Sequence, residues 1–243
     1  MKDGRTGAQA HGRTDAMARG CTAMLAGAGL FLGLLAAVPL AAQTPDAGGI
    51  LDGAAAAIGR ATTLRADFTQ RIHDQMLGTD ETSSGEFLEQ RPGRFAMRWH
   101  HPAGDLILAD GRVLWVYLPS SAPKQVVRTD LTGKPGQSAD FVEEFLDHPR
   151  QRFTVTWVRA DTVGTRPAQV IALVPRATTN LPYERAQLWV DEADSLVRRV
   201  EINEGSGAVR RITLDHLRVN APIPASSFRF TPPAGVRVVD ATE

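Results

Sequence analysis

Large apolar residues recur with a period of two within positions 95–99, 105–109 and 112–118. Successive side chains of a β-strand point to opposite faces of the sheet, so this period predicts three strands. Asp110 and Gly111 separate the last two segments, and an Asp-Gly pair is a strong signal for a tight hairpin turn. The region is therefore expected to be antiparallel, with a large amount of aromatic surface.

The same period predicts strands on both sides of this region. They are expected at residues 64–72, 85–90, 124–129, 152–158, 168–174, 185–190, 196–202 and 210–219. Apolar residues at helical spacing predict one amphipathic helix at 138–148, and an alanine-rich stretch predicts a short helix at 50–58. About ten sequential strands with short turns indicate a strongly curved antiparallel sheet or barrel. The helices are too few for a bundle, so they are expected to cover an open side.

The N-terminal region has the pattern of a secretory signal peptide. Arg19 precedes an almost wholly apolar stretch at 24–42, which the small residues Ala41 and Ala42 end. We therefore expect residues 1–42 to be a signal peptide, with Met17 as the more typical start, and residues 43–243 to be a single domain.

A permanent membrane anchor is the alternative for this stretch, because an apolar segment of about 20 residues can span a bilayer. Its glycine and alanine content and Pro39 favour cleavage instead. The single cysteine, Cys21, precedes the apolar stretch, whereas an acylated cysteine would follow it. We therefore expect the mature chain to carry no lipid anchor.

Composition and motifs give little support to an enzyme or a nucleic-acid-binding protein. The 243 residues include 27 basic and 27 acidic side chains, so no basic excess favours nucleic acid. None of the six histidines has a partner at metal-ligand spacing, and no nucleophile or phosphate-loop motif is present. His216 follows Ile212 and Leu214 in strand register, so we expect it to be partly buried. We expect no cofactor.

Several short motifs, taken in their order along the chain, resemble one family. They are Phe68-Thr69-Gln70, Gly85, Arg91-Pro92, the segment 95–99, Pro102, Asp110-Gly111 with Trp115 and Tyr117, and the ending at 228–236. Together, over residues 50–240, they resemble the LolA family of periplasmic carriers of outer-membrane lipoproteins.

The resemblance implies an α+β, mainly β fold: an unclosed antiparallel half-barrel of about 10–11 strands, with a helical lid over an apolar cavity. It implies a periplasmic carrier and not an enzyme. The implied partners are acylated lipoproteins, an inner-membrane lipoprotein-releasing ABC transporter and an outer-membrane lipoprotein receptor. We expect a monomer that does not bind nucleic acid.

The resemblance also implies a site. Arg91 matches an arginine that bonds to the lid backbone and governs its opening, and Phe95 matches a phenylalanine at the cavity mouth. Apolar residues of the predicted strands and of the helix at 138–148, the expected lid, are assigned to the acyl-chain cavity: Phe68, Phe87, Phe95, Met97, Trp99, Leu106, Leu108, Trp115, Tyr117, Phe141 and Phe145.

Three alternatives stay open. The aromatic residues could fill an ordinary core, because both faces of the segment 113–117 are apolar. A related fold could serve a periplasmic regulator that senses lipids or lipoproteins. A secreted hydrolase could assemble its catalytic residues in space, where sequence spacing does not reveal them.

Overall fold

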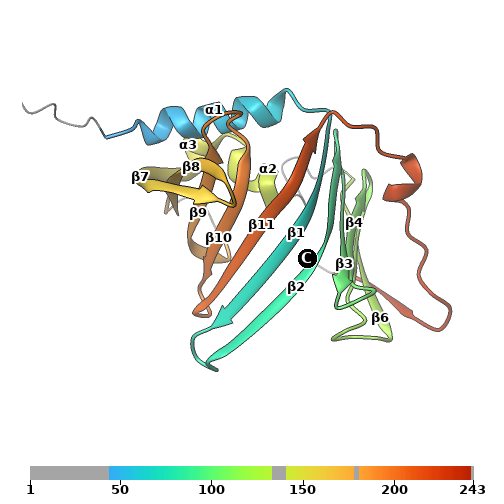
Figure 1. Ribbon diagram of the computed structural model, residues 1–243. Helices are drawn as coiled ribbons and strands as arrows, with labels where there is room; N and C mark the ends of the chain where they lie inside the picture. Colours follow the sequence, from blue (N-terminus) through green and yellow to red (C-terminus); the bar gives the residue numbers. More distant parts are fainter. Residues whose placement is uncertain (1–43, 133–140, 178–180, 242–243) are drawn as a thin grey trace, which may run out of the picture. The chain divides into compact units, whose positions relative to one another are not determined.

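A computed structural model describes residues 44–132, 141–177 and 181–241 of the chain (Figure 1). All of these residues belong to one compact unit, Gln43–Glu243. No helix among the described residues is long and apolar enough to cross a membrane.

The elements of this unit are mostly strands. The helices are α1 (Ala47–Gly59), α2 (Phe141–Leu146), α3 (Pro149–Arg152) and the 3₁₀ helix η1 (Ala225–Phe228). The strands are β1 (Thr63–Asp74), β2 (Thr79–Gln90), β3 (Arg94–His101), β4 (Leu106–Asp110), β5 (Val113–Tyr117), β6 (Gln125–Asp130), β7 (Phe153–Val163), β8 (Arg166–Pro175), β9 (Tyr183–Asp191), β10 (Val197–Glu204), β11 (Ala208–Val219) and β12 (Arg237–Asp240).

The described strands form one sheet in the order β12-β6-β5-β4-β3-β2-β1-β11-β10-β9-β8-β7. Neighbours are antiparallel except β12, which runs parallel to β6. Because β12 and β7 are edges that do not pair with each other, the sheet is unclosed. The predicted mainly β, unclosed half-barrel is confirmed. The sheet has twelve strands, and the prediction missed β12 because only four residues, 237–240, form it.

One face of the sheet, here called the inner face, carries the main core and the helices. In β1 the inner residues are Leu64, Ala66 and Phe68, which are buried as the period of two requires. Helix α1 begins at the N-cap Asp46, which accepts a hydrogen bond from the backbone N–H of Gly48 at 3.0 Å. It packs on β7, β8 and β9, and on α2 and α3. Its alanine-rich face lets it lie close to the strands.

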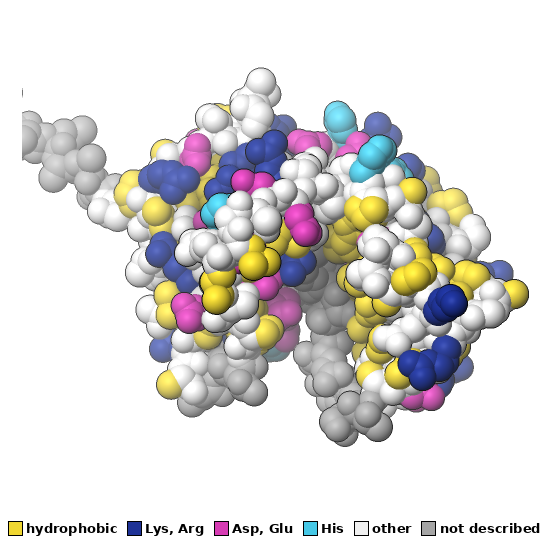
Figure 2. Space-filling view, turned by 90° about the horizontal axis from the view of Figure 1, so that it is seen from below, with side chains coloured by type: hydrophobic (Ala, Val, Ile, Leu, Met, Phe, Trp, Pro, Cys, Tyr) yellow, Lys and Arg dark blue, Asp and Glu magenta, His cyan; other side chains and the backbone are white. Residues whose placement is uncertain are grey.

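The opposite, outer face carries a second apolar cluster over β2 to β5. The C-terminal segment 223–230, which includes η1, covers this part of the sheet. Figure 2, viewed from below, shows hydrophobic side chains on both sides of a hollow in the molecular surface. The sheet is therefore apolar on both faces in its β2–β5 part, and only one of these is the inner face that carries the main core.

Candidate functional site

The inner face brings together six of the predicted cavity residues. Phe68, Phe87, Phe95, Met97 and Phe145 are buried in the main cluster, and Trp99 packs against it. The rings of Phe68 and Trp99 meet edge to face, with centroids 5.2 Å apart.

Gly85 makes this aromatic contact possible. It pairs with Phe68 on β1 and with Trp99 on β3. A Cβ atom at this position would lie 1.9 Å from the carbonyl oxygen of Arg98 and 2.8 Å from the Phe68 ring. Since any larger residue would displace the backbone or the ring, Gly85 allows the two aromatic side chains to lie over the strand.

Polar side chains border the aromatic surface along β1 and β2. The indole N–H of Trp99 donates to Ser83 Oγ at 3.2 Å, and Gln70 Nε2 donates to the same hydroxyl oxygen at 3.2 Å. Arg210 Nη1 donates to Gln70 Oε1 at 3.4 Å. The inner face therefore changes from apolar to polar towards the hairpin that joins β1 and β2.

Helix α2 contributes to the other side of the inner cluster. The Phe145 ring lies 5.5 Å from that of Tyr183 and 6.2 Å from that of Phe153. Burial, and then the nearby carboxylate of Glu144, raise the pKa of the Tyr183 hydroxyl. The Phe141 side chain, also predicted to face the cavity, lies outside the described residues, as does the first part of the expected lid at 138–140.

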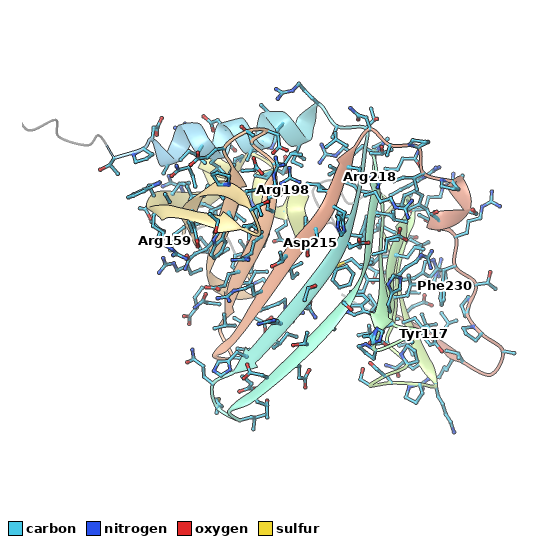
Figure 3. The ribbon with its side chains drawn as sticks, in the orientation of Figure 1. Tyr117, Arg159, Arg198, Asp215, Arg218 and Phe230 are labelled. Atoms are coloured by element: carbon cyan, nitrogen blue, oxygen red, sulfur yellow. The ribbon has the colours of Figure 1, made fainter. Side chains whose placement is uncertain are left out.

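The structure separates four predicted cavity residues from this surface. Leu106 and Leu108 are buried in the outer cluster, and Trp115 and Tyr117 pack against it. Each of the two aromatic rings lies 5.7 Å from the ring of Phe230, and Figure 3 shows Tyr117 and Phe230 together. This corrects the predicted lining: the C-terminal segment covers these four side chains.

On β4 and β5, the inner face is formed instead by the residues at the alternate positions. Ala109 is buried in the inner cluster, and Ile107 and Leu114 pack against it. The period of two was correct, but it left open which set faces inward because both sets are apolar. The pairing of Ala109 with Phe95 and with Leu114 places all three on one face.

Arg91 joins the turn between β2 and β3 to the C-terminal end of α1. Its Nη1–H donates to the carbonyl oxygen of Ile58 at 2.6 Å, and its Nε–H donates to Glu89 Oε1 at 2.6 Å. Carbonyl groups in the last turn of a helix lack intrahelical partners and carry partial negative charge, so a guanidinium group is a favourable partner there. Arg91 thus contacts a helix that covers the inner face.

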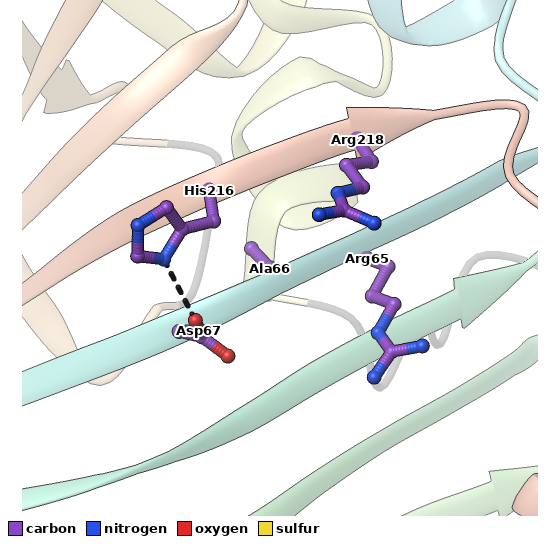
Figure 4. Close-up of a pocket in the computed structure, with 5 residues that line it drawn as sticks. All are labelled: Arg65, Ala66, Asp67, His216 and Arg218. Atoms are coloured by element: carbon purple, nitrogen blue, oxygen red, sulfur yellow. Dashed lines mark hydrogen bonds and ion pairs between the residues drawn. The ribbon is translucent and has the colours of Figure 1, made fainter.

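A polar pocket of about 360 Å³ lies at a bulge between β1 and β11 (Figure 4). His216, with φ of 52°, bonds to Asp67 at 2.8 Å, and Arg65 pairs with Glu86 at 2.7 Å. The expectation that His216 is partly buried was wrong, because the bulge turns its side chain outward. Charged groups line this pocket, so it does not suit an acyl chain.

Within the described ranges, no three histidine, cysteine, aspartate or glutamate side chains gather closely enough to hold a metal ion. The chemistry that the inner face offers is apolar contact, with Arg91 at its border. The fold and this surface define a class: half-barrels whose helices cover an apolar inner face.

Within this class, the chain belongs to the family of the outer membrane lipoprotein carrier protein LolA. The family model matches residues 59–231. The chain is 32% identical over 181 residues to an outer-membrane lipoprotein carrier protein of Alkalilimnicola ehrlichii, covering 74% of this chain and 78% of that protein. It is 29% identical over 217 residues to the protein of the same name from Ralstonia nicotianae, covering 83% and 93%.

The fold also resembles solved structures. An uncharacterized conserved protein from Thermus thermophilus superposes with a TM-score of 0.52 and 12% identity, covering 80% of this chain and 99% of that one. This likeness concerns the fold alone. Both of the relatives described above bear the names of carrier proteins and not of enzymes.

Proposed function

We propose that this protein is a periplasmic carrier that binds the acyl chains of lipoproteins released from the inner membrane and delivers them to an outer-membrane receptor. The observation that carries the proposal is the contiguous apolar cluster of the inner face, which contains Phe68, Phe95 and Met97 and also residues of α1 and α2. Membership of the carrier family supports it. On this proposal the protein catalyses no reaction.

The hydrophobic effect explains why such cargo needs a carrier. Burial of each methylene group is worth about 0.8 kcal/mol, so exposing one long acyl chain to water costs on the order of 10 kcal/mol. The inner-face residues of β1, β2 and β3 offer the apolar surface that offsets this cost. The polar side chains of Ser83 and Gln70, at the border of this surface, would lie next to the polar groups of the cargo.

Cargo binding on this surface requires the helices to move. Phe68, Phe87 and Phe145 are almost completely buried, so acyl chains can reach them only when neighbouring elements move, and we propose that α1 or α2 lifts. We propose that Arg91 gates this movement, because its bond to Ile58 holds the end of α1. A reversible opening allows the carrier to release its cargo as well as to bind it.

The proposed partners follow from this route. An inner-membrane lipoprotein-releasing ABC transporter would supply the acylated protein, and an outer-membrane lipoprotein receptor would accept it. The chain would act as a monomer, because the inner face is covered by its own helices.

Two neighbouring residues of β5 provide the test of the inner face. Leu114 packs on the inner cluster and Trp115 on the outer one, and both are partly buried. With a photo-crosslinking amino acid at either position, we expect crosslinks to a triacylated lipoprotein from position 114 and none from position 115. The readout is a gel shift detected with an antibody to the lipoprotein. Equal crosslinking at both positions would contradict the proposed site.

A further inference from the structure

Glu89 places a carboxylate within the apolar part of the sheet. It pairs with Leu64 on β1 and with Phe95 on β3, and residues that pair directly share a face. Its side chain is 4% exposed. Removing a carboxylate from water is costly unless its oxygens are well bonded, so a buried glutamate here needs an explanation.

The bonding of Glu89 is only half complete. Oε1 accepts the Nε–H of Arg91 at 2.6 Å, whereas Oε2 is buried without a hydrogen-bond partner. An unsatisfied buried oxygen lowers stability. Glu89 is therefore not explained by a contribution to stability, and its role is in its contact with Arg91.

Glu89 fixes the orientation of the Arg91 side chain. A guanidinium group is planar, so a bond to Nε also sets the direction in which its Nη–H groups point. With Nε bonded to Glu89, Nη1 lies 2.6 Å from the carbonyl oxygen of Ile58. The Arg91 side chain is 22% exposed and would otherwise be free to turn towards water.

We propose that Glu89 is a positioning residue: it aims Arg91 at the last turn of α1 and so sets how readily α1 lifts from the inner face. Glu89, Arg91 and Ile58 together form what we call the α1 latch. The inference rests on the proposed function in one respect only, that α1 lifts to admit cargo.

Hydrogen exchange on the cargo-free protein tests the latch directly. We expect Glu89→Gln and Arg91→Leu each to speed amide exchange in the last turn of α1 by about tenfold, the effect of losing one charge-assisted hydrogen bond. The double variant should exchange no faster than Arg91→Leu alone, because Glu89 acts through Arg91. Glu86→Gln is the matched control. It removes the ion pair between Glu86 and Arg65 and should leave the exchange rate of the α1 amides unchanged.

A stability measurement separates positioning from a merely structural role. Replacing a buried ion pair by apolar residues is often neutral or stabilising. The variant with Glu89→Leu and Arg91→Leu should therefore keep or raise the Tm and yet lose the slow exchange of α1. A Tm loss without a change in α1 exchange would overturn the proposal, as would additive exchange effects of Glu89→Gln and Arg91→Leu.

Measuring lipoprotein transfer together with α1 exchange distinguishes a failure of the proposed function from a failure of the latch. If α1 exchange rises in Glu89→Gln while lipoprotein transfer to acceptor membranes keeps its rate, the latch is supported and its part in cargo transfer is contradicted. If exchange and transfer both keep their wild-type values, Glu89 does not position Arg91.

Discussion

Two buried carboxylates, Glu89 and Asp191, differ in how many hydrogen bonds they accept. Glu89 is buried with one bonded oxygen, whereas Asp191 is buried with many partners. Arg166, Arg198 and the backbone N–H of Ala193 all donate to Asp191. The first arrangement costs stability and controls a neighbour, and the second stabilises the turn between β9 and β10.

The Asp191 group gives stability a specific dependence on pH. Burial alone would raise the pKa of this carboxyl, but the Arg166 and Ala193 hydrogen bonds and the charge of Arg198 outweigh it and lower the pKa from 3.8 to about 2. A lowered pKa in the folded state contributes stability that is complete above pH 3.8 and is lost as pH falls through 2.

We therefore expect the Tm of the wild type to fall between pH 4 and pH 2, and Asp191→Asn to flatten that part of the curve. At pH 7 the variant should melt at a lower temperature, because the buried Arg198 loses one of its two carboxylate partners and keeps only Asp194. Calorimetry across this pH range checks both expectations. A parallel acid slope in the variant would show that other carboxyl groups dominate.

At the scale of elements, β4 and β5 separate two functions. Their inward residues, such as Ala109 and Leu114, belong to the proposed cargo surface, and their outward residues pack under the C-terminal segment. The rings of Trp115 and Tyr117 meet Phe230 there. The C-terminal segment is therefore a structural cover for these strands, on the face away from α1.

Truncating Phe230 tests this separation. We expect Phe230→Ala to lower the free energy of unfolding by roughly 1–3 kcal/mol, because a partly buried aromatic side chain is lost. Lipoprotein binding should keep its wild-type affinity. Denaturant unfolding and binding titrations measure the two quantities, and a loss of binding at unchanged stability would place Phe230 in the cargo site instead.

At the scale of the whole described unit, the unclosed sheet allows opening without loss of pairing. Strand β1 joins β2 on one side to β11 on the other, while β7 and β12 remain edges. Helix α1 packs on β7 to β9 and meets the opposite half of the sheet through Arg91. Breaking that contact frees the end of α1 from the β2–β3 half of the sheet and leaves the strand ladders intact.

Cargo binding should therefore change exchange unevenly. On adding a triacylated peptide, we expect amides of α1, α2 or both to exchange faster, because the helix that lifts leaves the inner face, and amides of β1 and β11 to stay protected. Hydrogen exchange with mass spectrometry measures this, with the same peptide lacking its acyl chains as the control. Uniformly slower exchange throughout the unit would contradict an opening of the helices.

The sequence by itself determined much of the local structure. A period of two identified most of the strands. It also identified the inward face of β1, where Leu64 and Phe68 are separated by two repeats of that period. Helical spacing placed Phe145 on a buried face of α2. Family resemblance drew attention to Arg91. These signals are local, since each depends on residues only a few positions apart.

Only the tertiary structure decided which face of β4 and β5 is inner, that His216 turns outward, and that Arg91 lies between Glu89 and Ile58. Both faces of β5 are apolar, so the choice depends on Phe230, more than a hundred residues further along the chain. His216 depends on a bulge in its pairing with β1. Such outcomes arise from contacts between distant segments, and local periodicity carries no information about them.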